Sequence, residues 1–284
     1  MEKLYEGIDV SKWQGTVDFQ KVKKSGMDFV MLRTGFGRFE GQKDPTFERN
    51  YQNAKAQNLF VGAYHYSYAK SVEEAKEEAK FCLSILEGKT FEFPIAFDME
   101  ERTVASLGKE KVSAIAKAFC EALEDAGYYV VIYANKFWLD NLFTDEIFSR
   151  YDIWLAHWVK ESNFDKAYGL WQYTSDGQVD GISGRVDLDF AYKNYQKIMQ
   201  KNGLNGFKAE NDTMYAGKEI TLSDAPLYAT ASTGAVSSRK SGTFYLYDGK
   251  KINDRYRITN SKNRVEKEPI ATNVTGYVRE SDVR

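Results

Sequence analysis

Short apolar runs and amphipathic runs alternate along the first two thirds of the chain. The apolar runs are rich in β-branched and aromatic residues, a composition typical of buried strands. Strands that alternate with helices favour a parallel sheet covered by helices, which is the α/β fold class. The expected strands cover residues 7–13, 28–35, 59–68, 93–100, 128–135, 152–159, 170–175 and 185–192.

Two of the amphipathic runs predict helices over residues 71–89 and 111–127. Ser71 is the expected N-cap of the first helix and Gly88 its expected stop, and Gly127 ends the second helix. Apolar residues at helical spacing form one stripe on each helix. The expected inward positions are Val72, Ala75, Ala79, Cys82 and Leu86 in the first helix, and Val112, Ile115, Ala116, Phe119, Cys120 and Leu123 in the second.

Strands with interleaved helices predict a parallel, TIM-like β/α barrel, and a doubly wound open sheet is the alternative. After residue 150 the spacing leaves no room for full helices between the last strands. We therefore expect the final third of the barrel to be abbreviated.

The hydrophobic pattern changes near residue 201, which divides the chain into regions 1–200, 201–215 and 216–284. The middle region has little apolar periodicity and is expected to be a linker. In the last region short strands separated by Gly, Asp-Gly and Asn/Ser turns predict a small all-β barrel or sandwich. Its expected strands are 219–229, 242–249, 256–261 and 276–283.

Composition and charge argue against some classes of function for this protein. The net charge of -2 argues against a dedicated nucleic-acid-binding protein, which usually has a strong basic excess. No apolar run approaches the ~20 residues of a membrane span. Residues 205–284 carry 13 Lys and Arg against 10 Asp and Glu, whereas residues 1–204 carry 26 against 31. The difference suggests that the C-terminal region, rather than the barrel, meets anionic surfaces.

The N-terminus leads directly into the first expected strand, with no basic segment and no apolar signal core. We therefore expect the protein to be made in the cytoplasm and to leave it by another route. Cys82 and Cys120 are the only cysteines, and both fall on apolar helix faces as small core residues do. With only His65 and His157 in addition, no metal site and no cofactor are expected.

The stretch PIAFDMEE begins as a buried strand and ends with three carboxylates, and burying unpaired charge is costly. In a parallel barrel the functional groups gather at the carboxyl ends of the strands. Asp98 and Glu100 end the fourth strand and Asp9 ends the first. Asp187 and Asp189 lie in the last strand, which neighbours the first when a barrel closes. Each alone could cap a helix or pair with an arginine, but together they predict an acidic cluster over one mouth.

Such a cluster suits glycoside hydrolysis, because crowding raises the pKa of one carboxyl group and leaves a proton donor beside an ionised partner. Aromatic residues accompany these strand ends, where they could form sugar-stacking walls, although packing is their commoner role. The aromatic candidates are Trp13, Tyr64, Tyr66, Tyr68, Tyr133, Trp154, Trp158, Trp171 and Tyr173, and His65 and His157 are candidate hydrogen-bonding groups.

Four fragments, in order, resemble the lysozymes of glycoside hydrolase family 25 over residues 5–195. They are GIDVSKWQG, GAYHY, FDME and WQYTSDGQVDGISGRVDLDF. The resemblance implies an irregular (β/α)5(β)3 barrel. It also implies hydrolysis of the β-1,4 bond between N-acetylmuramic acid and N-acetylglucosamine in bacterial peptidoglycan.

The resemblance also implies roles for individual residues. Glu100 matches the general acid, Asp98 the carboxylate that assists at the anomeric carbon, and Asp9 an acid of the pocket floor. Asp187 fits the family's Val-Asp position better than Asp189 does, and both residues remain candidates for it. Many members have Lys-Ala-Thr-Glu-Gly where this chain has LRTGFG, so an arginine replaces the lysine and no glutamate follows. The substrate-binding candidates are Tyr64, Tyr66, Trp13, Arg33, Tyr133, His157, Trp171 and Gln172.

Residues 216–284 resemble bacterial Src-homology-3-like wall-binding modules through the fragments LYDGKKI, YRIT and GYV. Together the two regions resemble a bacteriophage endolysin, and a prophage or chromosomal autolysin would look the same. The expected partners are therefore peptidoglycan and, through the C-terminal region, a cell-wall polymer. Self-association is the alternative for that region. The alternatives for the barrel are a non-catalytic wall-binding protein and a chitinase-like glycosidase.

Overall fold

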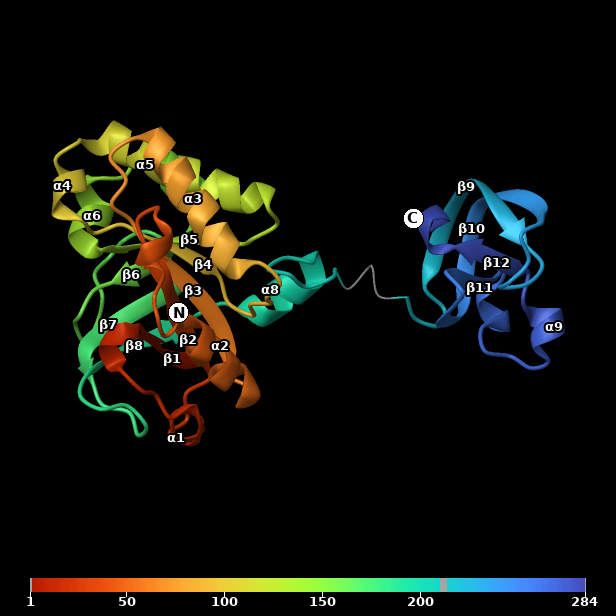
Figure 1. The fold of residues 1–284 in the computed structure, drawn as a ribbon, viewed down its shortest axis with the longest axis horizontal. Coiled ribbons are helices and arrows are strands. Elements are labelled where there is room, and N and C mark those ends of the chain that lie inside the picture. Colours follow the sequence, from red (N-terminus) through yellow and green to blue (C-terminus); the bar gives the residue numbers. More distant parts are fainter. Residues whose placement is uncertain (1, 210–213, 284) are drawn as a thin grey trace. The chain divides into compact units, whose positions relative to one another are not determined.

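The computed structural model describes residues 2–209 and 214–283. The chain divides into two compact units, Met1–Glu210 and Asn211–Arg284 (Figure 1). Each unit has a hydrophobic core of its own.

The first unit is a closed eight-stranded barrel whose strands follow one another in sequence order. Strands β1 to β7 are parallel, but β8 pairs antiparallel with both β7 and β1. The predicted barrel is therefore confirmed and the open sheet is wrong. The strands are β1 (Tyr5–Val10), β2 (Phe29–Phe36), β3 (Phe60–Tyr66), β4 (Ile95–Asp98), β5 (Val130–Asn135), β6 (Asp152–Ala156), β7 (Leu170–Gly177) and β8 (Val186–Ala191).

The last strand departs from the parallel arrangement of the other seven. A parallel connection needs roughly a dozen residues or more to cross back over the sheet. The segment 178–185 between β7 and β8 is shorter than that, so the chain returns as an antiparallel hairpin. This short connection accounts for the missing helix between β7 and β8.

Helices cover the outside of the barrel, as the ribbon shows (Figure 1). In α3 the Ser71 hydroxyl accepts the N–H of Glu74, as a capping residue does, and its predicted inward positions are buried except the partly buried Val72. Every predicted inward position of α5 is buried. No helix within the described ranges is long and apolar enough to cross a membrane. The helices are α1 (Phe19–Lys24), α2 (Phe47–Ala56), α3 (Val72–Leu86), α4 (Arg102–Ala105), α5 (Lys109–Asp125), α6 (Lys136–Asn141), α7 (Asp145–Arg150) and α8 (Tyr195–Asn202).

Part of the expected linker 201–215 belongs to the barrel unit instead. Asn205 is fully buried, and its amide group donates to the Phe93 carbonyl at 2.8 Å and accepts the Tyr129 N–H at 2.7 Å. Leu204 and Phe207 pack against the same barrel core. Periodicity alone missed this segment because a single buried amide, rather than an apolar stripe, attaches it. Residues 210–213 of the expected linker lie outside the described residues.

The second unit is a closed four-stranded antiparallel barrel with strand order β10-β11-β12-β9. Strand β10 begins at Val236, earlier than the apolar pattern predicted, because its first part carries polar residues. The core contains apolar residues from all four strands. The elements are β9 (Glu219–Tyr228), β10 (Val236–Ile252), β11 (Arg255–Thr259), α9 (Ile270–Asn273) and β12 (Gly276–Arg279).

We predict that Asn205→Ala lowers the free energy of unfolding of the barrel unit by on the order of 2 to 4 kcal/mol, because it leaves a buried carbonyl and a buried N–H unpaired. Asn205 also has a φ of 55°, which asparagine tolerates better than alanine does. All five tryptophans lie in this unit, so urea denaturation followed by tryptophan fluorescence reports on it. Asn202→Ala, at an exposed amide, is the control and should change stability by less than about 1 kcal/mol. Equal losses in the two variants would contradict the prediction.

Candidate active site

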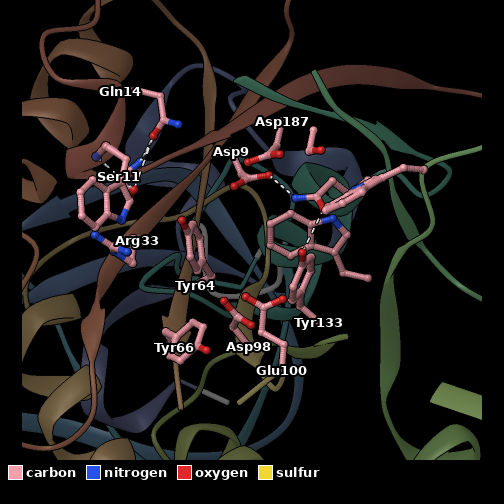
Figure 2. A pocket seen from close by; sticks show the side chains of 15 residues that line it. Asp9, Ser11, Gln14, Arg33, Tyr64, Tyr66, Asp98, Glu100, Tyr133 and Asp187 are labelled. Atoms are coloured by element: carbon pink, nitrogen blue, oxygen red, sulfur yellow. Dashed lines mark hydrogen bonds between the residues drawn. The ribbon is translucent and has the colours of Figure 1, made fainter. Parts of the chain in front are cut away.

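A pocket of about 350 Å³ opens at the carboxyl ends of the parallel barrel strands (Figure 2). Its volume is in the range of small-molecule sites. Its lining combines carboxylates, aromatic rings and a single cationic side chain. The lining residues are Asp9, Ser11, Trp13, Gln14, Arg33, Tyr64, Tyr66, Asp98, Glu100, Tyr133, Trp154, Trp158, Gln172, Ser175 and Asp187.

The strand register brings the acidic side chains together. Asp9 ends β1 and stands opposite Asp187 at the start of β8, because β8 runs antiparallel and its first residues reach the same mouth. Asp98 ends β4, and Glu100 follows it. Figure 2 shows Asp9 near Asp187, and Asp98 beside Glu100, on the walls of one pocket.

Burial raises the pKa values of all four carboxyl groups, and charged neighbours raise those of Asp9, Asp98 and Glu100 further. Burial is the largest cause for each. The charge of Asp187 adds to the rise for Asp9 and Glu100, and the charge of Glu100 adds to it for Asp98. The pKa of Asp187 is raised from 3.8 to about 6. The pocket therefore retains protons at pH values where exposed carboxyl groups have lost them.

Gln172 holds Asp9 in place. Its Nε2 donates to Asp9 Oδ2 at 2.7 Å, and its Oε1 accepts from Tyr133 at 2.9 Å and from Trp158 Nε1 at 3.0 Å. Two donors on Oε1 fix the orientation of the amide, so the nitrogen faces the carboxylate. Gln172, predicted as a substrate-binding residue, lines the pocket, and its amide group is already used by these three neighbours.

The structure separates Asp187 from Asp189. Asp187 lines the pocket, whereas Asp189 is fully buried, with Oδ1 accepting from Trp154 Nε1 at 2.8 Å. Burial raises the pKa of Asp189 well above its ordinary value, and the nearby charge of Asp9 raises it further. Asp187 is therefore the residue of the two that reaches the pocket.

Arg33 is held by Asp44, a residue that the sequence patterns did not indicate. Asp44 Oδ2 accepts from Arg33 Nε at 2.9 Å and from the Lys12 N–H at 3.0 Å, and Asp44 Oδ1 accepts two hydrogen bonds from Thr46. Burial raises the pKa of Asp44, but these hydrogen bonds outweigh it and the pKa is lowered. Asp44 lies in a loop eleven positions beyond Arg33 and belongs to no motif, so no sequence signal predicted it.

Aromatic rings form the pocket walls and rim. Tyr64, Tyr66 and Tyr133 line the walls, as predicted, while Trp13 and Trp158 are 76% and 60% exposed at the rim. Ser11, Gln14 and Ser175 line the pocket without having been predicted, since single polar residues after a strand carry little signal.

Trp171, predicted as a substrate-binding residue, is not among the residues that line this pocket. Neighbouring residues of a strand face opposite sides, and Gln172 faces inward. Trp171 is therefore turned outward, where it packs on Tyr173 and Phe190 and donates to the His157 carbonyl at 2.8 Å.

His157 lies in a second hollow of about 300 Å³ beside the first. The two hollows share Glu100, Tyr133 and Trp158, so Glu100 stands at their junction. The remaining lining residues of the second hollow are Asn135, Lys136, Phe137, Ala156 and His157.

The other histidine and the cysteines take no part in the pocket. His65 is fully buried between Thr34 and the Gly37 carbonyl, and burial lowers its pKa to about 4. Cys82 and Cys120 are buried core thiols. Among the residues that the structure describes, no group of three or more His, Cys, Asp and Glu side chains is arranged to hold a metal ion.

Comparison with known proteins gives one family. The sequence model described as glycosyl hydrolases family 25 matches residues 8–182. Uncharacterized protein YegX of Escherichia coli (strain K12) is 35% identical over 189 residues, which are 64% of this chain and 68% of that protein. Autolytic lysozyme of Clostridium acetobutylicum is 32% identical over 186 residues, covering 65% of this chain and 55% of the relative. The crystal structure of the CTP1L endolysin superposes with a TM-score of 0.61 at 26% identity and covers 69% of each chain.

The chain therefore belongs to glycosyl hydrolases family 25 and is a glycoside hydrolase. The match to residues 8–182 lies within the barrel unit, which contains the acidic pocket.

The raised pKa of Asp187 predicts a pH-dependent stability. A carboxyl group whose pKa rises on folding binds its proton more tightly in the folded state, so the free energy of unfolding falls as the pH rises from about 4 to about 6. We expect Asp187→Asn to be more stable than the wild type at pH 7.5, by on the order of 1 to 2 kcal/mol, and equal to it near pH 4. Urea denaturation at both pH values measures this difference. Asp125→Asn, at an exposed position of α5, is the control, and a gain that did not depend on pH would contradict the prediction.

Proposed function

We propose that the chain is a lysozyme that hydrolyses the β-1,4 bond between N-acetylmuramic acid and N-acetylglucosamine in bacterial peptidoglycan. The observation that carries this proposal is the gathering of Asp9, Asp98, Glu100 and Asp187 around one sugar-sized pocket with aromatic walls. The names of the relatives, an autolytic lysozyme and an endolysin, support the same substrate class.

Glu100 is the proposed general acid. A general acid must hold a proton before the reaction and must reach the leaving oxygen. Burial and the charge of Asp187 raise the pKa of Glu100, which favours the protonated form. Its position at the junction of the two hollows lets it face a bond that spans them.

Asp98 is the proposed partner on the anomeric side. It is almost fully buried, and its Oδ1 has no hydrogen-bond partner among the described residues. A buried, unpartnered carboxylate oxygen strongly favours a donor from the substrate. That donor is either the N–H of the substrate's acetamido group or a water molecule that attacks the anomeric carbon. Asp9 and Asp187 face the same pocket, and Asp187, with a pKa of about 6, is ionised at neutral pH and stabilises the positive charge that develops on the sugar ring.

The arrangement of the hollows suggests how the glycan lies. The acidic pocket holds the sugar whose anomeric carbon reacts, because Asp9, Asp98 and Asp187 line only that side. The second hollow, with Phe137 and Trp158 exposed, then receives the leaving sugar against aromatic faces.

The two alternatives fit the pocket less well. A non-catalytic wall-binding protein has no need for a cluster of carboxyl groups with raised pKa values, and such a cluster lowers stability. A chitinase-like enzyme of the Asp-x-Glu type has a longer acidic run ahead of that motif. Here the residues ahead of Asp98 are Ile95, Ala96 and Phe97, which are buried and apolar.

The second unit is proposed to be a Src-homology-3-like module that binds a cell-wall polymer. Its closed four-stranded barrel is compatible with that class, and lysines and arginines outnumber its carboxylates. Docking on the wall would raise the local concentration of the barrel unit at its substrate. The likeness to an endolysin also supports an endolysin-type role, in which the enzyme reaches the wall when it is released from the cytoplasm at lysis.

We predict that Glu100→Gln folds normally but loses a factor of about 10² to 10⁴ in rate, the usual contribution of a general acid. Asp98→Asn should be affected as severely. The release of reducing ends from purified peptidoglycan measures the rate, and mass analysis of the fragments identifies the sugar at the new end. Glu110→Gln, an exposed position of α5, is the control. Near-normal turnover in the Glu100→Gln chain would remove this residue from the mechanism.

A second prediction concerns the C-terminal unit. The Glu100→Gln chain should sediment with purified cell walls, because the walls remain intact. A chain that carries the same substitution but contains only residues 1–209 should sediment several-fold less. Equal sedimentation of the two chains would refute a wall-binding role for residues 214–283.

A further inference from the structure

Arg33 is the single cation among the fifteen residues that line the acidic pocket. Four carboxyl groups face it across the same cavity, and Figure 2 shows it on the side of Ser11 and Gln14. Its side chain is 11% exposed. A guanidinium group this deeply buried is stable only with partners that satisfy its charge and its N–H groups.

Asp44 accepts hydrogen bonds from only some of the N–H groups of the Arg33 guanidinium. Nε donates to Asp44 Oδ2 at 2.9 Å, which fixes the orientation of the planar fork. The second nitrogen, NH2, lies 2.8 Å from the same oxygen but makes no hydrogen bond within the described part of the chain. Asp44 already accepts from Lys12 and Thr46, so its acceptor capacity is largely used. Arg33 is therefore held rigidly while it keeps donor capacity beside the pocket.

Asp98 is not the partner that this donor capacity serves. The charge of Arg33 reaches Asp98, but the buried Asp98 Oδ1 has no hydrogen-bond partner among the described residues. An arginine placed to neutralise Asp98 would bind it directly, as it binds Asp44. Arg33 and Asp98 instead line the same cavity, as in a site built for a ligand with both acceptor and donor groups.

We propose that Arg33 binds the lactyl carbonyl or carboxylate oxygens of the muramic acid in the pocket and thereby selects this sugar over N-acetylglucosamine. The inference rests on the proposed function. The two sugars of the glycan differ in the lactyl ether on O3, which ends in a carboxyl group or in its amide with the stem peptide. A fixed guanidinium fork matches such oxygens, and each charge-assisted hydrogen bond is strong in a partly desolvated site. Arg33 is therefore a specificity-determining residue.

The test measures binding in the Glu100→Gln chain, so that hydrolysis does not consume the ligand. Three tetrasaccharides are compared: wall glycan with its stem peptides, the same glycan with free lactyl carboxylates, and chitotetraose, which has no lactyl group. We expect Arg33→Met to weaken binding of both lactyl ligands by about 10- to 100-fold, the effect of losing one charge-assisted hydrogen bond, and binding of chitotetraose by less than about threefold. The first two ligands show whether the carboxylate or the amide is bound more tightly.

Three further variants separate this role from a structural one. Arg38→Met, at a nearby arginine that pairs with Glu74 and Glu77, should leave all three affinities unchanged. Arg33→Lys keeps the charge but not the fork, so it should bind the free carboxylate better than the amide. Asp44→Asn keeps Arg33 but loosens its orientation, and it should weaken binding of the lactyl ligands in particular.

Equal weakening for all three ligands in Arg33→Met and in Arg33→Lys would overturn the proposal, and so would unchanged binding of the lactyl glycans. If none of the ligands binds the Glu100→Gln chain, the proposal also fails. The proposed function is tested separately, by the release of reducing ends from peptidoglycan by the chain with Glu100 intact. An active enzyme without lactyl preference refutes only the role of Arg33.

Discussion

The pairing of β8 with β1 is the constraint on which the site depends. It closes the barrel, and its antiparallel register places Asp187 directly opposite Asp9. A parallel β8 would have carried the start of the strand, and Asp187 with it, to the other end of the barrel. The short connection after β7 is therefore a functional feature, because it turns the last strand around and completes the acidic pocket.

Closing the barrel in this way lowers the free energy of unfolding, because it gathers carboxyl groups in a buried pocket. Asp9, Asp98 and Glu100 lose water and gain charged neighbours, and both effects favour the protonated form. Hydrogen bonds offset this cost for one of these carboxyl groups and not for another. Asp9 receives a hydrogen bond from Gln172, whose orientation Tyr133 and Trp158 fix, while Asp98 keeps an unpartnered oxygen. Asp98, which keeps this unpartnered oxygen, is proposed to contact the reacting sugar, where a donor of the substrate can satisfy it.

Periodicity predicted the barrel, the helices α3 and α5 and the four strands of the second unit, because each of them buries a regular apolar pattern. It could not predict single polar attachments. Asn205 joins the segment after α8 to the barrel by its amide group, and Asp44 holds Arg33 from a loop without a motif. The sequence also shows alternation along β7. Because Gln172 faces inward in the structure, this alternation places its neighbour Trp171 on the outer side of the strand. The alternating pattern alone did not show whether Trp171 or Gln172 points into the barrel.

Asp187 and Asp189 show how depth, rather than residue type, separates two similar side chains. They lie two positions apart on β8 and so face the same side, yet Asp187 borders the pocket and Asp189 is fully enclosed. Without access to water, Asp189 is more stable with a proton, while its Oδ1 accepts from Trp154 Nε1. Asp9 is held by the amide of Gln172, and Asp187 is the carboxyl group of β8 that faces the pocket.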